Sequence, residues 1–168
     1  MDKLKIMVVD DSLIMISNLT HTLTEMGHEV VGTARSGSEA VFKFKKLNPD
    51  IITMDITMGN LNGIDAVEKI MKADPNMIII MITSHGQEKL VIDAVSVGAK
   101  GYLLKPIKYE NLNKVITDVY KKYGKAQEEK IQDKKAQEEK IQNIKTQDQK
   151  VEDKKLQSRN PYLDLRLD

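Results

Sequence analysis

Short apolar runs alternate along residues 1–124 with longer segments in which apolar residues recur every three or four positions. The short runs are rich in β-branched residues, which favours strands, and the recurring spacing is typical of helices with one buried face. We expect strands at 4–9, 29–33, 50–54, 77–83 and 101–104. We expect helices at 12–26, 38–47, 63–72 and 88–97, and a last helix from Tyr109. This alternation predicts an α/β fold with a doubly wound, five-stranded parallel sheet.

Two segments allow more specific predictions of burial. The run at 77–83 is apolar at nearly every position, so we expect this strand to be central and buried on both faces. The last helix carries apolar residues at the spacing of a core-facing stripe. These residues are Leu112, Val115, Ile116, Val119 and Tyr123.

The composition changes at Gly124, after which a ten-residue unit recurs three times, at 126–135, 136–145 and 146–155. Its Ala, Gln, Glu and Lys residues favour helix. A period of ten turns the helical face by about 80° per repeat, so Ile131 and Ile141 do not form one stripe. We therefore expect a domain at 1–124 and, at 125–168, a polar tail that is either helical or disordered and has no core of its own. Its end, at 162–168, is either a disordered terminus or a strand that docks on a partner.

Composition and charge exclude several classes of protein. The chain has 26 basic and 25 acidic residues, no Cys, no Trp and only two Phe. Balanced charge and few aromatic residues disfavour direct DNA binding. The N-terminus is too acidic for a signal peptide, and no run approaches the roughly 18 apolar residues of a membrane span. We therefore expect a cytoplasmic protein with no membrane insertion.

Polar residues follow the predicted strands at the end where parallel sheets carry their functional sites. They are Asp10, Asp11, Asp55, Thr83 and Lys105. Three clustered carboxylates repel one another and need a hard divalent cation, either Mg²⁺ or Mn²⁺. An aspartate can attack phosphorus to form an acyl phosphate, while the cation and a lysine stabilise charge on the phosphoryl oxygens. A threonine hydroxyl can donate a hydrogen bond that exists only after phosphorylation, as a switch requires.

Structural explanations compete with these functional ones. Aspartates are favoured at helix starts, so the three acids could be caps, although the whole pattern disfavours this. Thr83 could be a threonine at the edge of the core, and Tyr102 a static, half-buried aromatic residue. His21 and His28 have no partners at ligand spacing, and we interpret them as surface or structural residues.

Four motifs, in this order, resemble those of the response-regulator receiver family. They are VVDDS at 8–12, MDI at 54–56, TS at 83–84 and GAKGYLLKP at 98–106. The resemblance covers residues 1–123 and implies the flavodoxin-like, CheY-like receiver fold. It also implies a phosphorelay or chemotaxis-type switch, phosphorylated by a sensor histidine kinase or a phosphotransfer protein.

The resemblance also implies a role for each site residue. Asp55 is the phospho-acceptor, and Mg²⁺ is held by Asp10, Asp11, Asp55 and the backbone carbonyl of Thr57. Any catalysis is limited to phosphorylation and dephosphorylation of the chain's own Asp55.

Further residues of the motif contact the phosphoryl group or respond to it. Lys105 contacts the phosphoryl group, Thr83 is the switch hydroxyl, and Tyr102 changes rotamer on activation. Two departures from the family concern the loops of the site. Gly59 replaces a common proline, which makes the loop carrying the cation ligand more flexible. His85 lies where the family controls water access, so the sequence does not give the lifetime of the phosphate.

Two rival functions remain at this point. A haloacid-dehalogenase-like phosphohydrolase would carry a D-x-D motif on its first strand, whereas Asp11 here follows Asp10 directly. The other rival is a phosphorylation-independent scaffold that binds through its tail. The chain retains all five polar residues that follow the predicted strands, which disfavours this function. The polar residues after Gly124 cannot form an output domain. We therefore expect a downstream protein target. The resemblance to the receiver family implies that this target binds the face built by the fourth helix, fifth strand and fifth helix.

Overall fold

The computed structural model describes residues 3–59, 62–124, 138, 141–142 and 144. The chain divides into two compact units, Met1–Gln127 and Glu128–Asp168. The four described residues of the second unit are helical, and its Ile141 and Ile144 are exposed. The other residues of the predicted repeats at 126–155, and the terminal segment 162–168, lie outside the described residues.

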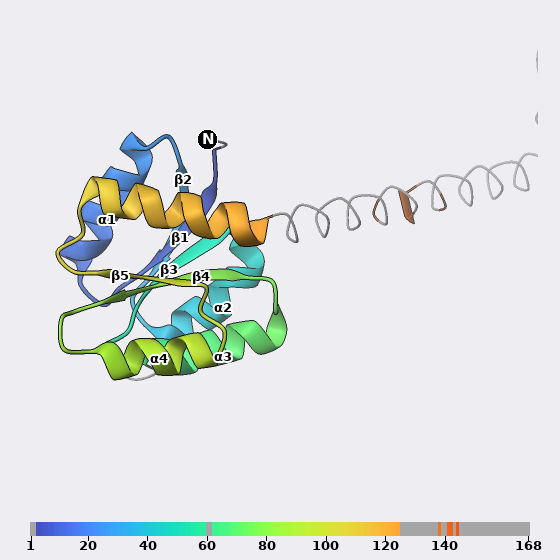
Figure 1. The fold of residues 1–168 in the computed structure, drawn as a ribbon. Coiled ribbons are helices and arrows are strands. Elements are labelled where there is room, and N and C mark those ends of the chain that lie inside the picture. Colours follow the sequence, from blue (N-terminus) through green and yellow to red (C-terminus); the bar gives the residue numbers. More distant parts are fainter. Residues whose placement is uncertain (1–2, 60–61, 125–137, 139–140, 143, 145–168) are drawn as a thin grey trace, which may run out of the picture. The chain divides into compact units, whose positions relative to one another are not determined.

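Five parallel strands form one sheet in the order β2-β1-β3-β4-β5 (Figure 1). They are β1 (Lys5–Val9), β2 (Glu29–Ala34), β3 (Ile51–Asp55), β4 (Ile78–Thr83) and β5 (Gly101–Leu104). All six residues of β4 are buried, as the sequence predicts. β4 lies inside the sheet between β3 and β5, while β3 takes the middle position and is equally buried. The predicted doubly wound parallel sheet is confirmed.

Four helices connect the strands, and a fifth follows β5. They are α1 (Leu13–Glu25), α2 (Gly37–Leu47), α3 (Gly63–Ala73), α4 (Glu88–Ser96) and a helix over 109–124. The side chains of Ser12, Ser36 and Asn62 cap α1, α2 and α3 by accepting a backbone N–H of the first turn. The side chain of Gln87, which precedes α4, makes no such cap. α4 therefore begins differently from the three helices before it.

The two faces of the sheet bury separate apolar clusters. α2, α3 and α4 pack on one face, while α1 and the helix over 109–124 pack on the other (Figure 1). Leu112 and Ile116 are fully buried and Val119 nearly so, which confirms the predicted stripe. Among the described helices, none has both the length and the apolar character that a membrane span requires.

Candidate functional site

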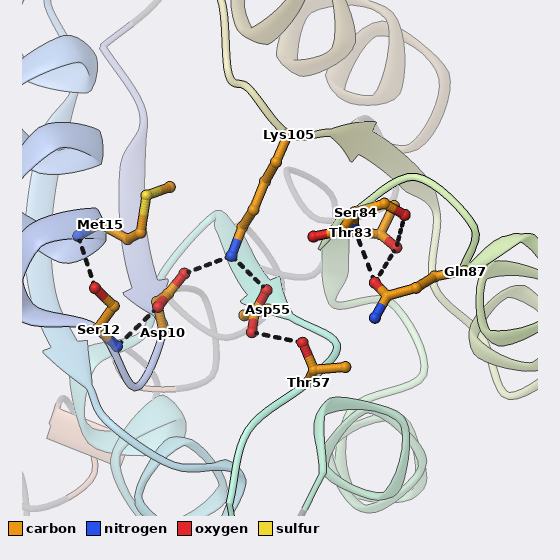
Figure 2. A network of polar contacts seen from close by, with 9 residues as sticks. All are labelled: Asp10, Ser12, Met15, Asp55, Thr57, Thr83, Ser84, Gln87 and Lys105. Atoms are coloured by element: carbon orange, nitrogen blue, oxygen red, sulfur yellow. Dashed lines mark hydrogen bonds and ion pairs between the residues drawn. The ribbon is translucent and has the colours of Figure 1, made fainter.

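The carboxyl ends of the inner strands meet at one rim of the sheet and carry polar side chains there. Asp10 directly follows β1, and Asp55 ends the neighbouring strand β3. Asp55 is paired with Ile82, so Thr83 lies one residue further along the adjacent strand β4. Lys105 follows β5, and its backbone N–H donates to the Thr83 carbonyl at 2.7 Å. The sheet therefore gathers residues from four separate parts of the sequence (Figure 2).

Three carboxylates lie together at this rim, as the sequence predicts. One oxygen each from Asp10, Asp11 and Asp55 lie within 4.8 Å of one another. Asp10 and Asp55 are only 1% and 3% exposed, whereas Asp11 faces solvent. The backbone N–H of Ser12 donates to Asp10 Oδ1 at 2.9 Å, which fixes the orientation of that carboxylate. Two buried negative charges so close to each other require compensation.

Lys105 provides part of that compensation. Its Nζ lies 2.8 Å from Asp55 Oδ1 and 3.3 Å from Asp10 Oδ2. Burial raises the pKa of Asp55, and the charges of Asp10 and Asp11 raise it further, while Lys105 acts in the opposite direction. Burial alone would lower the pKa of Lys105, but the two carboxylates outweigh this effect and raise it. The Lys105–Pro106 peptide bond is cis.

The donor set fits a hard divalent cation. All three candidate ligands are carboxylate oxygens, and the exposed side of Asp11 leaves room for water ligands. The single positive charge of Lys105 offsets only one of three negative charges, so an additional cation would be attracted. Thr57 contacts the cluster through its hydroxyl, which lies 3.5 Å from Asp55 Oδ2. A role for its backbone carbonyl stays a prediction.

The two predicted switch residues occupy different environments. Thr83 is buried at the end of β4, and its hydroxyl donates to Gln87 Oε1 at 2.8 Å. Tyr102 lies on the edge strand β5 and is 51% exposed. The structure therefore places Thr83 beside Asp55 with its proton directed elsewhere, and leaves the Tyr102 ring accessible.

Two residues that shape the site escaped the sequence analysis. Gln87 binds Thr83, but a glutamine in a loop gives no signal of such a contact. A β-carbon on Gly63 would lie 2.2 Å from the Asp55 carbonyl oxygen. The signal for Gly63 in the sequence was a glycine, the residue that tolerates a close backbone contact, at the first position of a predicted helix. Glycine therefore allows α3 to begin against the backbone of Asp55.

The chain matches known proteins over the part that forms the sheet. The family model described as the response regulator receiver domain matches residues 6–117. The chemotaxis protein CheY of Thermotoga maritima is 48% identical over 115 residues, which cover 66% of this chain and 96% of that protein. CheY of Bacillus subtilis is 39% identical over 112 residues, which cover 67% of this chain and 93% of that protein.

A solved structure shares both the fold and part of the sequence. It is the complex of CheX and CheY with BeF3 and magnesium from Borrelia burgdorferi, matched with a TM-score of 0.66 and 37% identity. The match covers 69% of this chain and 88% of that one. Fold and sequence thus identify the same group of proteins.

Proposed function

This chain belongs to the response regulator receiver domain family, and from that premise we propose that its Asp55 accepts a phosphoryl group from a histidine kinase or a phosphotransfer protein. One observation carries the proposal. Asp55 is buried, lies with Asp10 and Asp11 in a cluster of carboxylate oxygens, and contacts the ammonium group of Lys105 at 2.8 Å. A nucleophilic oxygen, a cation site and a fixed positive charge thus lie together.

In the proposed reaction, a carboxylate oxygen of Asp55 forms a bond to phosphorus while the bond between phosphorus and the donor's histidine nitrogen breaks. The imidazole leaves with its electron pair and takes up a proton. Asp10, Asp11, Asp55 and the Thr57 carbonyl would hold Mg²⁺ or Mn²⁺, and that ion would offset negative charge on the carboxylates and the phosphoryl oxygens. The reaction ends in an acyl phosphate on Asp55.

Lys105 and Thr83 then hold the new group. Lys105 has three N–H donors and already reaches toward Asp55, so it can donate to a phosphoryl oxygen without leaving the site. Thr83 follows the residue paired with Asp55, so its hydroxyl can turn toward the same group. Both contacts differ between the two states, which lets phosphorylation shift a conformational equilibrium.

The proposed output is a protein contact in the cytoplasm. α4, β5 and the start of the last helix carry five of the exposed large apolar side chains. They are Ile92, Val95, Tyr102, Leu104 and Tyr109. CheY of Borrelia burgdorferi was solved in complex with the protein CheX, which supports a downstream protein as the partner here. The similarity to chemotaxis proteins favours a chemotaxis-type pathway.

Phosphorylation by a small-molecule donor tests the proposal. With acetyl phosphate and Mg²⁺, the mass of the full chain is expected to rise by one phosphoryl group that hydroxylamine removes. Asp55→Asn is expected to abolish the adduct. Asp50→Asn is the control, because Asp50 precedes the same strand and binds the Lys5 N–H away from the rim. An adduct that persists in Asp55→Asn would show that another residue is the acceptor.

A further inference from the structure

Gln87 accepts two hydrogen bonds that hold the end of β4 to the start of α4. Its Oε1 receives the Thr83 hydroxyl at 2.8 Å and the backbone N–H of Ser84 at 2.9 Å (Figure 2). The Thr83 side chain is buried and Gln87 is half-buried, so the contact between them is partly shielded from solvent. The same hydroxyl lies 3.4 Å from the Ser84 carbonyl, a longer and weaker contact. Gln87 is thus the main acceptor for the Thr83 proton in this structure.

A threonine hydroxyl has a single proton to donate. While that proton is directed to Gln87, it is not available to an oxygen of a phosphoryl group on Asp55. The oxygen of Gln87 and the phosphoryl oxygen therefore compete for the same proton. In the unphosphorylated chain, Gln87 accepts it. We propose that Gln87 is a positioning residue that holds Thr83 in the unphosphorylated arrangement and thereby opposes the switch; this rests on the proposed role of Thr83.

The position of Gln87 connects this competition to α4. Gln87 immediately precedes α4, yet its side chain reaches back to Thr83 and Ser84 instead of capping the helix. When Thr83 turns toward the phosphoryl group, the carboxamide of Gln87 loses one of its two donors. The start of α4 then loses a restraint, and α4 carries the exposed Ile92 and Val95 of the proposed output surface. Gln87 therefore connects the phosphorylation site to the proposed output surface directly, because it contacts Thr83 and immediately precedes α4.

Beryllium fluoride, which binds carboxylates as a phosphoryl mimic, gives a direct test. The full chain is titrated with it in the presence of Mg²⁺, and backbone amide resonances report the bound fraction. Gln87→Leu keeps much of the side-chain volume but removes the acceptor. We expect it to tighten the apparent binding roughly twofold to tenfold, which is the effect of removing one competing hydrogen bond of ordinary strength. Gln87→Glu keeps the acceptor and is expected not to tighten it.

Two further measurements separate this role from a general loosening of the loop. In the Thr83→Ala background, Gln87→Leu is expected to leave the affinity unchanged, because the proton under competition is absent. The Ser84 amide proton, whose hydrogen bond to Gln87 is absent in the variant, is expected to lie upfield in Gln87→Leu before any beryllium fluoride is added.

The outcomes distinguish the two proposals. Binding of beryllium fluoride by the unaltered chain, with no tightening in Gln87→Leu, would overturn the role of Gln87 and leave the proposed function intact. Equal tightening with and without the Thr83 hydroxyl would also overturn it. If the unaltered chain did not bind beryllium fluoride in Mg²⁺ at all, both proposals would fail.

Discussion

The Lys105 ammonium group lies between two carboxylates that the fold has taken out of water. Its side chain is 26% exposed, whereas those of Asp10 and Asp55 are 1% and 4% exposed. Removing it would leave both carboxylates without their shared positive charge. The remaining negative charge would then attract a divalent cation more strongly.

We therefore expect Lys105→Ala to lower the free energy of unfolding by about 1–3 kcal/mol without divalent cations, because a buried charge loses its partner. Mg²⁺ should restore more of the thermal midpoint in Lys105→Ala than in the unaltered chain. Thermal unfolding with and without Mg²⁺ measures both effects. Lys72→Ala is the control, since Lys72 forms an exposed pair with Glu68. An equal response to Mg²⁺ in all three proteins would contradict the prediction.

His28 is a buried histidine at the opposite end of the sheet from the site. Its Nδ1 accepts the backbone N–H of Leu4 at 3.4 Å, and its Nε2 has no hydrogen-bond partner within the described part of the chain. Burial lowers the pKa of His28. The histidine is thus a structural residue, one of the two roles that the sequence allowed.

A lowered pKa makes stability depend on pH with a definite sign. Below about pH 6.5, the unfolded chain binds a proton at His28 that the folded chain still excludes, so the free energy of unfolding falls. The slope contributed by His28 is at most about 1.4 kcal/mol per pH unit. Urea unfolding at pH 7.5, 6.0 and 5.0 should show a shallower pH dependence in His28→Gln. Identical slopes in the two proteins would exclude His28 as a source.

At the scale of elements, the junction of β3 and α3 depends on one close backbone contact. The Gly63 N–H donates to the Ile56 carbonyl at 3.0 Å, which brings the first residue of α3 back against the end of β3. A β-carbon there would overlap the Asp55 carbonyl oxygen and would lie 3.1 Å from the Asp55 carbonyl carbon and from Ile56 Cα. All three are backbone atoms, so a side-chain rotation cannot relieve the overlap.

Gly63→Ala should therefore lower the free energy of unfolding by about 1–3 kcal/mol, the usual cost of overpacking. It should also weaken phosphorylation, because Asp55 must shift. Gly59→Ala is a matched control in the same connection, since a β-carbon there meets nothing within 4 Å. Urea unfolding and phosphorylation by acetyl phosphate measure the two effects. Equal losses of stability and of phosphorylation in the two variants would argue against the close contact at Gly63.

The elements themselves could be read from hydrophobic spacing. Every predicted strand and connecting helix agrees with the structure to within one residue at each end. The rim residues could be found for a related reason. In a parallel sheet the carboxyl ends of all strands lie at the same edge, whatever the order of the strands in the sheet. Polar residues at strand ends therefore indicate a shared edge without knowledge of that order.

Contacts that depend on the path of a loop could not be predicted in this way. Apolarity alone pointed to 77–83 as the central strand, but β3 is in the middle although it contains Thr53 and Asp55. The contact between Thr83 and Gln87 depends on the turn between β4 and α4. Periodicity says nothing about such turns, because their side chains follow no repeating direction.

For the whole molecule, the sequence predicts that the folded domain is stable without the tail. Residues 125–168 contain few apolar side chains, so they have little surface to bury. The helix over 109–124, in contrast, contributes the buried Val119 to one apolar cluster of the sheet and packs Tyr123 against that cluster. Stability should therefore be determined by residues up to Gly124.

Truncation after Gly124 is expected to leave the thermal midpoint almost unchanged. Truncation after residue 117, where the family match ends, is expected to lower it, because Val119 and Tyr123 are then lost. Calorimetry of the two truncated chains and the full chain decides between these outcomes. A fall of more than ~5 °C after the first truncation would mean that the tail contributes to stability.

The close contact between Gly63 and the backbone of Asp55 also limits which substitutions position 63 can accept. Every single-nucleotide change that replaces this glycine with another amino acid introduces a β-carbon, and that atom would meet the main chain of Asp55. No conservative substitute exists among the other amino acids, because only glycine lacks that carbon. A substitution at position 63 is therefore expected to destabilise the domain unless the neighbouring loop changes with it.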